Sequence, residues 1–162
     1  MESHVTTLRL ADGLHFTGRT ASGHQVELDS RLDAAGPGVG PSPMELQLLA
    51  LGGCGAMDTI SILRKMRQDV TGYEVRLTHE RATEHPRVFT AITITHAING
   101  RDLAEGMVRR AIGLTMSKYC PVYAMLHPTV DIRECYEITD EASRTTTSGD
   151  VTIEDAQAEP KA

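Results

Sequence analysis

Aromatic residues are scarce in this sequence. It has no tryptophan, and four tyrosines and two phenylalanines make up an aromatic content of 4 %. The core is therefore expected to consist mainly of aliphatic residues and methionine. A surplus of positive charge is lacking too, because 16 Lys and Arg stand against 22 Asp and Glu, for a formal net charge of −6. This balance argues against a nucleic acid as the partner.

Long apolar runs and a secretory signal are also lacking. No stretch approaches the ~18 consecutive apolar residues that indicate a membrane span. The start, Met1-Glu2-Ser3-His4, is not a basic segment followed by an apolar run. Three cysteines, an odd number in 162 residues, do not form the disulfide framework of a secreted protein. We therefore expect a cytoplasmic protein without a membrane partner, and in that compartment paired thiols are more often reactive than structural.

Metal and cofactor motifs are missing as well. The seven histidines do not fall in the His-x₃-His spacing, and the cysteines do not fall in the Cys-x₂-Cys spacing, that metal sites use. The sequence has no phosphate-binding glycine loop, serine-centred elbow or dinucleotide fingerprint. It therefore predicts neither a bound metal nor a cofactor.

Alternating apolar and polar residues predict six strands and leave room for two helices. The first three strands are separated by turn residues, which indicates an antiparallel meander. The expected strands are Val5–Leu10, Leu14–Gly18, His24–Asp29, Tyr73–Leu77, Val88–Ile98 and Thr129–Thr139. The expected helices run from about 42 to 67 and from about 102 to 119. This order predicts an α+β fold with a largely antiparallel sheet, in one domain over residues 1–139.

The last part of the chain, residues 140–162, has a different composition. It is rich in Ser, Thr and Gly, and it carries six acidic residues against Arg144 and Lys161. Because it lacks hydrophobic periodicity, we expect an acidic, disordered C-terminal tail.

The helix expected over residues 42–67 has clear start signals. Ser42 can act as the N-cap, Pro43 suits the first helical position, and Glu45 completes a capping box. Apolar residues then surround most of the circumference, which is typical of a helix buried on all sides. One small sheet cannot cover such a helix, so the sequence predicts an intertwined homodimer.

Cys54 lies in this apolar helix within Gly52-Gly53-Cys54-Gly55. Each glycine costs about 1 kcal/mol relative to alanine in a helix interior, so another helix or a ligand must approach this turn closely. Free cysteine is also a common buried hydrophobe. A reactive thiol and a structural one are both compatible with this context.

Cys120 follows 66 residues later, directly before Pro121. If Pro121 starts a short helix, Cys120 is its N-cap and the helix dipole favours the thiolate; if Cys120 only ends the preceding helix, the dipole disfavours it. Cys135 shares strand parity with Asp131 and Glu137, away from the apolar face, and we interpret it as incidental to any redox site.

Glu45 is explained by the capping box alone, but its spacing adds a constraint. Nine residues separate it from Cys54, which is a rise of ~13.5 Å and about half a helical turn. On a straight helix Glu45 therefore cannot reach its own Cys54, and it could serve only the thiol of another subunit.

These segments resemble the OsmC/Ohr family of thiol-dependent peroxidases over roughly residues 8–138. The resemblance rests on Ser42-Pro43-Met44-Glu45, Gly52-Gly53-Cys54 and Tyr119-Cys120-Pro121. It points to the YhfA-like branch through Gly23-His24-Gln25, Ser61-Ile62-Leu63, Arg67-Gln68-Asp69-Val70, Pro86-Arg87-Val88-Phe89-Thr90, Gly100-Arg101-Asp102-Leu103 and Lys118-Tyr119-Cys120. It implies an OsmC-like α+β fold with two main helices, exchanged between two chains, with active sites at the dimer interface.

The resemblance also implies a mechanism. Cys54 would be the peroxidatic thiol, Cys120 the resolving thiol and Glu45 an active-site carboxylate, and a dithiol reductant of the lipoyl type would reopen the disulfide. The family's peroxidases pair that glutamate with an arginine from the N-terminal strands. Here the candidates are Arg19 and Arg31, and neither falls at the family's position.

We therefore expect a homodimeric cysteine peroxidase, and the apolar helix around the thiol favours organic hydroperoxides over hydrogen peroxide. The alternative is a non-catalytic small-molecule-binding or redox-sensing protein on the same scaffold. In a third interpretation both cysteines are ordinary core residues.

Overall fold

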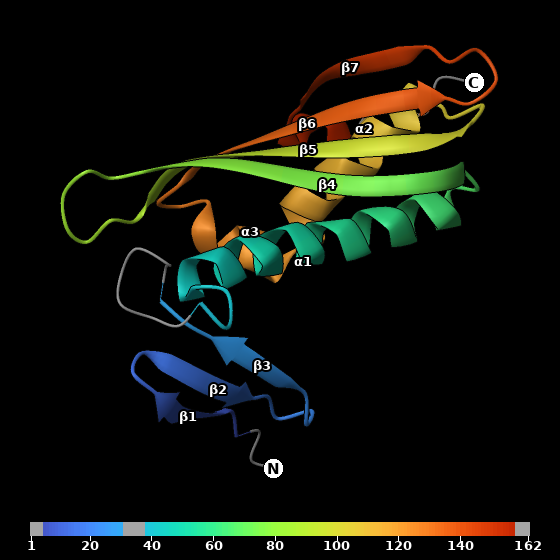
Figure 1. Cartoon of the computed structure of the whole chain (residues 1–162). Helices are drawn as coiled ribbons and strands as arrows, with labels where there is room; N and C mark the ends of the chain where they lie inside the picture. Colours follow the sequence, from blue (N-terminus) through green and yellow to red (C-terminus); the bar gives the residue numbers. More distant parts are fainter. Residues whose placement is uncertain (1–4, 31–37, 158–162) are drawn as a thin grey trace. The chain divides into compact units, whose positions relative to one another are not determined.

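A computed structural model describes residues 5–30 and 38–157 of the chain (Figure 1). The chain divides into two compact units, residues 1–49 and 50–162, where the sequence indicates one domain over 1–139.

The N-terminal unit contains the predicted meander, which is confirmed. Strands β1 (Thr7–Asp12), β2 (His15–Arg19) and β3 (Gln25–Leu28) pair in that order, and both pairings are antiparallel. Gly13 and Gly23, in the connecting turns, have φ values of 53° and 91°, a region that glycine adopts without the strain a Cβ would bring.

Helix α1 (Pro43–Lys65) begins with the predicted capping box. The Ser42 backbone N–H donates to the Glu45 carboxylate at 2.7 Å, the Ser42 hydroxyl donates to the same oxygen at 2.6 Å, and the Glu45 N–H donates back to Ser42 Oγ at 3.3 Å. This pattern satisfies backbone donors that the first turn leaves unpaired. The helix ends just before Arg67, whose φ of 58° is left-handed.

One chain does not bury α1 on all sides, as expected for an apolar helix that one small sheet cannot cover. Its buried residues are Leu51, Gly52, Thr59 and Leu63, whereas Met57 is 74 % exposed. By length and composition alone α1 could cross a membrane, with a mean hydropathy of 1.5, although no long unbroken apolar run is present. Of the 18-residue window that meets this criterion, 22 % is buried inside the described structure.

The C-terminal unit contains one four-stranded sheet. Strands β4 (Asp69–Arg81), β5 (Phe89–Arg101), β6 (Asp131–Asp140) and β7 (Thr146–Val151) pair in sequence order. The β5–β6 pair is parallel and the other two are antiparallel, so the sheet is mixed rather than largely antiparallel. Parallel neighbours need a long crossover, and the helical segment between β5 and β6 provides it.

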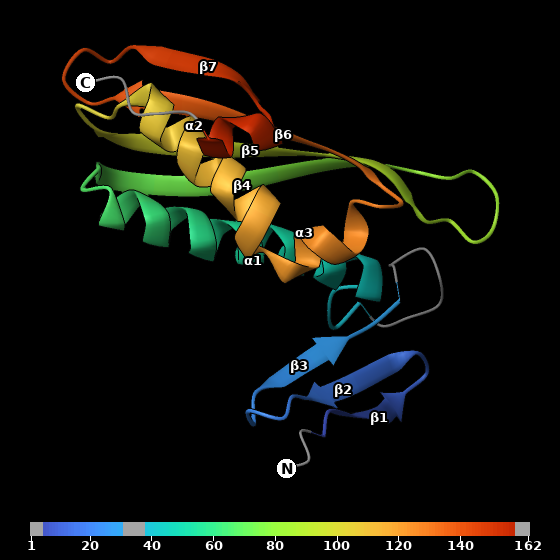
Figure 2. The same cartoon turned by 180° about the vertical axis from the view of Figure 1, so that it is seen from behind.

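This crossover is the second predicted helix, which the structure divides. It consists of α2 (Glu105–Leu114), the π-helical turn η1 (Thr115–Tyr119) and α3 (Pro121–Leu126). Both views show α1, α2 and α3 on the same face of the sheet (Figures 1 and 2). The buried core between them is mostly aliphatic, as predicted, and includes Leu63, Ile92, Ile98, Val108 and Ile112.

The segment 140–157 is folded, which corrects the expectation of a disordered tail. After β7 the chain forms the 3₁₀ helix η2 (Ile153–Gln157). The Asp155 carboxylate is buried and pairs with Arg109 Nη2 of α2 at 2.7 Å. A Cβ at Gly113 of α2 would lie 2.6 Å from the Ala156 backbone nitrogen, so η2 packs directly on the helix. Residues 158–162 of the predicted tail lie outside the described residues.

Candidate functional site

The fold brings Cys54 and Cys120 together. Cys54 lies in α1 and is half-buried, whereas Cys120 lies between η1 and α3 with 3 % of its surface exposed. The two thiols lie near enough for Cys54 to help raise the pKa of the Cys120 thiol, and neither cysteine is in a disulfide. The crossover that returns the chain from β5 to β6 thus places the second thiol against the first helix.

Cys120 is the N-cap of α3, which decides between the two alternatives left open by the sequence. Its backbone is extended, its Sγ accepts the Tyr123 N–H at 3.3 Å, and its own N–H donates to the Thr115 carbonyl at 2.9 Å. Burial, followed by the neighbouring Cys54 thiol, nevertheless raises the pKa of the Cys120 thiol to about 12, and the backbone N–H groups of α3 only partly oppose this rise. Cys120 is therefore a protonated thiol at neutral pH.

The three glycines around Cys54 have three different surroundings. A Cβ at Gly52 would lie 2.7 Å from Leu77 Cδ1 of β4, and one at Gly55 would lie 4.0 Å from Thr115 Cγ2. A Cβ at Gly53 would meet nothing within 4 Å. The close approach expected from the sequence thus comes from the sheet at Gly52, whereas the crossover at Gly55 is at an ordinary contact distance.

Glu45 lies exposed in the first turn of α1, where it forms the capping box with Ser42. It shares the unbroken helix α1 with Cys54. Of the two candidate arginines, Arg19 is the last residue of β2 and Arg31 lies outside the described residues.

Cys135 lies on the other face of the sheet from the helices, since its β6 neighbours Glu134 and Tyr136 are buried and it is not. Its thiol donates to Asp150 of β7 at 3.3 Å. Burial and the neighbouring carboxylate raise the pKa of this thiol to about 11. Its position agrees with the interpretation that it is incidental.

Sequence reasoning missed a buried polar cluster on the helix-facing side of the sheet. The His96 ring lies between two partners, with the Tyr73 hydroxyl 2.5 Å from Nδ1 and the Glu134 carboxylate 2.7 Å from Nε2. His96 and Glu134 are 1 % and 4 % exposed. The sequence did contain a signal, which is the strand parity of the two residues. His96 points to the same face of β5 as Ile94 and Ile98, and Glu134 points to the same face of β6 as its apolar residues.

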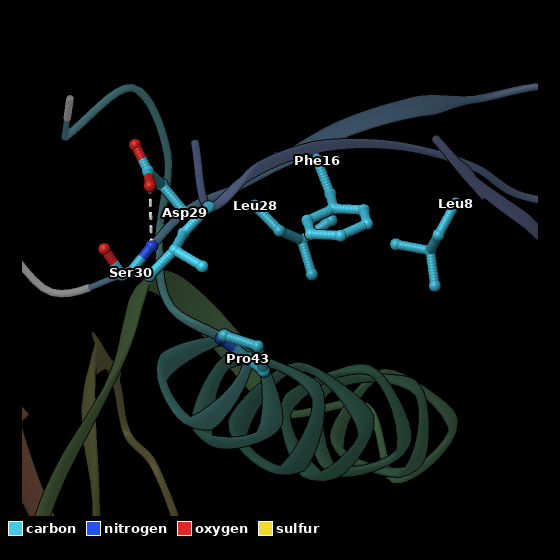
Figure 3. Close-up of a pocket in the computed structure, with 7 residues that line it drawn as sticks. Leu8, Phe16, Leu28, Asp29, Ser30 and Pro43 are labelled. Atoms are coloured by element: carbon cyan, nitrogen blue, oxygen red, sulfur yellow. Dashed lines mark hydrogen bonds between the residues drawn. The ribbon is translucent and has the colours of Figure 1, made fainter. Parts of the chain in front are cut away.

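The N-terminal unit has an apolar cavity of about 480 Å³ (Figure 3). Its lining residues are Leu8, Leu14, Phe16, Leu28, Asp29, Ser30 and Pro43. None of the predicted site residues is among them. Within residues 5–30 and 38–157, no three His, Cys, Asp or Glu side chains lie close enough together to hold a metal ion.

The comparison with protein families decides the relationship. The model of the OsmC-like protein family matches residues 36–134. The chain belongs to the OsmC-like family. Its relatives include protein YhfA of Escherichia coli strain K12, which is 47 % identical over 132 residues, or 81 % of this chain and 95 % of YhfA. The predicted family and branch are thereby confirmed.

Solved structures of other proteins agree with the fold. A hypothetical protein from Aquifex aeolicus VF5 is 28 % identical with a TM-score of 0.76, over 87 % of this chain and 99 % of the other. The organic hydroperoxide resistance protein OhrB of Bacillus subtilis matches with a TM-score of 0.57 and 16 % identity, over 82 % of this chain and 96 % of OhrB. At that identity the likeness shows a shared fold.

Proposed function

We propose that this OsmC-like protein is a thiol-dependent peroxidase that reduces organic hydroperoxides with Cys54 and Cys120. The observation that carries the proposal is the contact between the half-buried Cys54 thiol and the buried Cys120 thiol. A peroxidatic thiol must be reachable by its substrate, whereas a resolving thiol must be near it and otherwise unreactive. The two cysteines differ in this way.

The reaction balances with these two thiols. The Cys54 thiolate attacks the terminal oxygen of the hydroperoxide; the O–O bond breaks, a proton goes to the leaving alkoxide, and Cys54 becomes a sulfenic acid. The Cys120 sulfur then attacks the sulfenic sulfur, which forms the disulfide and releases water. A dithiol reductant returns both sulfurs to thiols by exchange, so the cycle needs neither a metal nor a bound cofactor.

Organic hydroperoxides are favoured by the apolar composition of α1, because an alkyl group gains from such a surface and hydrogen peroxide does not. Some proteins of similar fold, such as OhrB, are named for resistance to organic hydroperoxides. We infer the same substrate class here.

We further propose that the active form is a homodimer in which Glu45 serves the thiol pair of the other chain. Two features support this. Glu45 and Cys54 are half a turn out of phase on one helix, and large apolar side chains are exposed on α1, including Leu49 and Met57 at 66 % and 74 %. Such surface in a single chain is typical of a partner interface.

The test is a titration of free thiols before and after one equivalent of cumene hydroperoxide. We expect wild type to lose two thiols per chain, Cys54→Ser to lose none, and Cys120→Ser to lose one as a sulfenic acid that dimedone traps. Cys135→Ser is the matched control and should lose two. If wild type keeps all its thiols at neutral pH, the peroxidase proposal fails.

The second candidate is a non-catalytic protein that binds a small apolar molecule. The observation in its favour is the 480 Å³ cavity of the N-terminal unit, which is lined by leucines and Phe16. Saturable binding of a fluorescent fatty acid, with no loss of thiols on peroxide addition, would put this function first.

A further inference from the structure

The buried cluster around His96 continues beyond the sheet. Glu134, His96 and Tyr73 belong to β6, β5 and β4, so their two hydrogen bonds cross three strands on the helix-facing side. The Thr59 hydroxyl, on a fully buried residue of α1, lies near enough to the Tyr73 phenol to lower its pKa, against the larger rise that burial causes. This series of buried polar side chains thus extends from the sheet to α1, the helix that carries Cys54.

The series of buried polar side chains continues from α1 into the crossover between β5 and β6. Thr59 Oγ1 and Thr115 Oγ1 are 3.1 Å apart, and the Thr115 hydroxyl donates to the Ala111 carbonyl at 3.0 Å. A hydroxyl has one proton, so Thr59 donates to Thr115. Both threonines are buried, with 0 % and 3 % of their surfaces exposed.

Thr115, at the crossover end of this series of polar residues, is hydrogen-bonded to the backbone of Cys120. The carbonyl of Thr115 accepts the N–H of Cys120 at 2.9 Å, so Thr115 holds α1 through its side chain and Cys120 through its backbone. On α1, Thr59 comes five residues after Cys54, a rise of ~7.5 Å. Gly55, next to Cys54, is the helix position that faces the Thr115 methyl group.

Apolar side chains could occupy these buried positions between the sheet, α1 and the crossover without needing hydrogen-bond partners. Buried polar groups are costly unless every one is bonded, and a satisfied network then favours one arrangement of the elements over others. Two helices that cross over small residues can slide or rotate, whereas directional hydrogen bonds permit one register. The bond from Thr59 to Thr115 joins α1, the helix of Cys54, to the residue whose carbonyl accepts the Cys120 N–H.

We propose that the network of Glu134, His96, Tyr73, Thr59 and Thr115 positions Cys120 against Cys54 for disulfide formation. These are positioning residues, because they act through the helices and do not touch the substrate. The inference rests on the proposed function, since it concerns the disulfide of that reaction. Loss of the network lowers the effective concentration of one thiol at the other and makes the disulfide easier to reduce.

The test compares Thr59→Val and Thr115→Val with wild type in glutathione redox buffers, scoring the Cys54–Cys120 disulfide by mass spectrometry after alkylation. Valine keeps the shape of threonine and removes the hydroxyl. We expect the equilibrium constant for disulfide formation to fall about tenfold, which is a rise of about 30 mV in reduction potential for a two-electron couple. Thr59→Ser and Thr115→Ser keep the hydroxyl and should restore the wild-type value.

One control and one further variant separate positioning from general stability. Thr95→Val, on the other face of β5, should leave the disulfide equilibrium unchanged, and Glu134→Gln tests the far end of the network without altering the helices. We expect Glu134→Gln to shift the equilibrium in the same direction as the threonine variants. If the valine variants and Glu134→Gln keep the wild-type equilibrium while only their unfolding temperature falls, the network is structural and the inference is wrong. If wild type itself forms no disulfide, the proposed function fails instead.

Discussion

At the scale of single residues, Cys120 shows which physical effect prevails at a thiol. As the N-cap of α3 it accepts a backbone N–H from Tyr123, and such donors favour a thiolate. Burial and the Cys54 thiol oppose this and raise the pKa of Cys120 to about 12. The desolvation of a charged sulfur therefore outweighs one turn of helix. In the proposed reaction, a Cys120 thiol that stays protonated would not compete with Cys54 for the peroxide.

The variant Cys54→Ala tests this account of Cys120. Removal of the neighbouring thiol should lower the pKa of Cys120, yet burial should keep it above the ordinary value of 9.0. The measurement is the pH dependence of the rate at which iodoacetamide alkylates Cys120, followed by mass spectrometry, in a Cys135→Ala background so that Cys120 is the only thiol. The Cys54→Ser variant is a useful comparison, because a hydroxyl can still hydrogen-bond the thiol. A midpoint at or below 9.0 would mean that burial is not the main cause.

At the scale of elements, the C-terminal segment shows how composition can mislead. Ser, Thr, Gly and acidic residues without periodicity indicate disorder, but β7 needs only to pair with the edge of β6, and η2 needs only a few contacts with α2. Gly149 of β7 lies under the Tyr136 ring, where a Cβ would come within 2.8 Å of the hydroxyl oxygen. Small residues here permit close packing rather than flexibility.

Two glycines of α2 provide a matched test of that packing. Gly113→Ala should destabilise the protein, because its Cβ would meet the backbone of η2 at 2.6 Å; such overpacking costs about 1–3 kcal/mol. Gly106→Ala, in the same helix, meets nothing within 4 Å and should be neutral or stabilising by up to about 1 kcal/mol. Urea unfolding monitored by circular dichroism measures both. Equal stabilities for the two variants would mean that η2 does not pack on α2.

At the scale of the whole molecule, α1 is the helix whose apolar surface a single chain leaves largely exposed. It is apolar around most of its circumference, yet its buried residues lie on one stripe. Exposed apolar side chains of this size gain free energy when a second surface covers them. The proposed homodimer would supply that surface.

Substitution of the exposed Met57 by lysine tests the dimer and the site together. Met57→Lys should weaken self-association at least about tenfold, because a charge buried at an apolar interface is unfavourable. It should also slow the loss of thiols to cumene hydroperoxide if Glu45 acts across the interface. Val88→Lys, at a 51 % exposed residue just before β5, is the control and should change neither. Analytical ultracentrifugation and thiol titration provide the readouts, and a monomeric Met57→Lys with full reactivity would contradict the cross-subunit site.

Local patterns predicted a large part of this fold. The capping box at Ser42 and Glu45, the meander, and the alternation in β4, β5 and β6 all depend on neighbours within a few residues, so the sequence carries their signals directly. The parallel pairing of β5 with β6 was missed because strand direction depends on how the crossover packs. The His96–Glu134 pair was missed because a polar residue at a buried parity is stable only with a partner that lies far away in sequence.

Motif spacing and helix signals are local, so the amino-acid sequence was enough to identify the family, the helix that carries Cys54 and the pair of cysteines worth testing. The packing of the folded chain was needed to show that the two thiols lie near each other, that Cys120 caps α3 yet stays protonated, and that buried polar side chains extend from Glu134 to Thr115. Those properties depend on burial and on distances between residues up to 75 positions apart, from Thr59 to Glu134. They arise only when the helices pack on the sheet and exclude water.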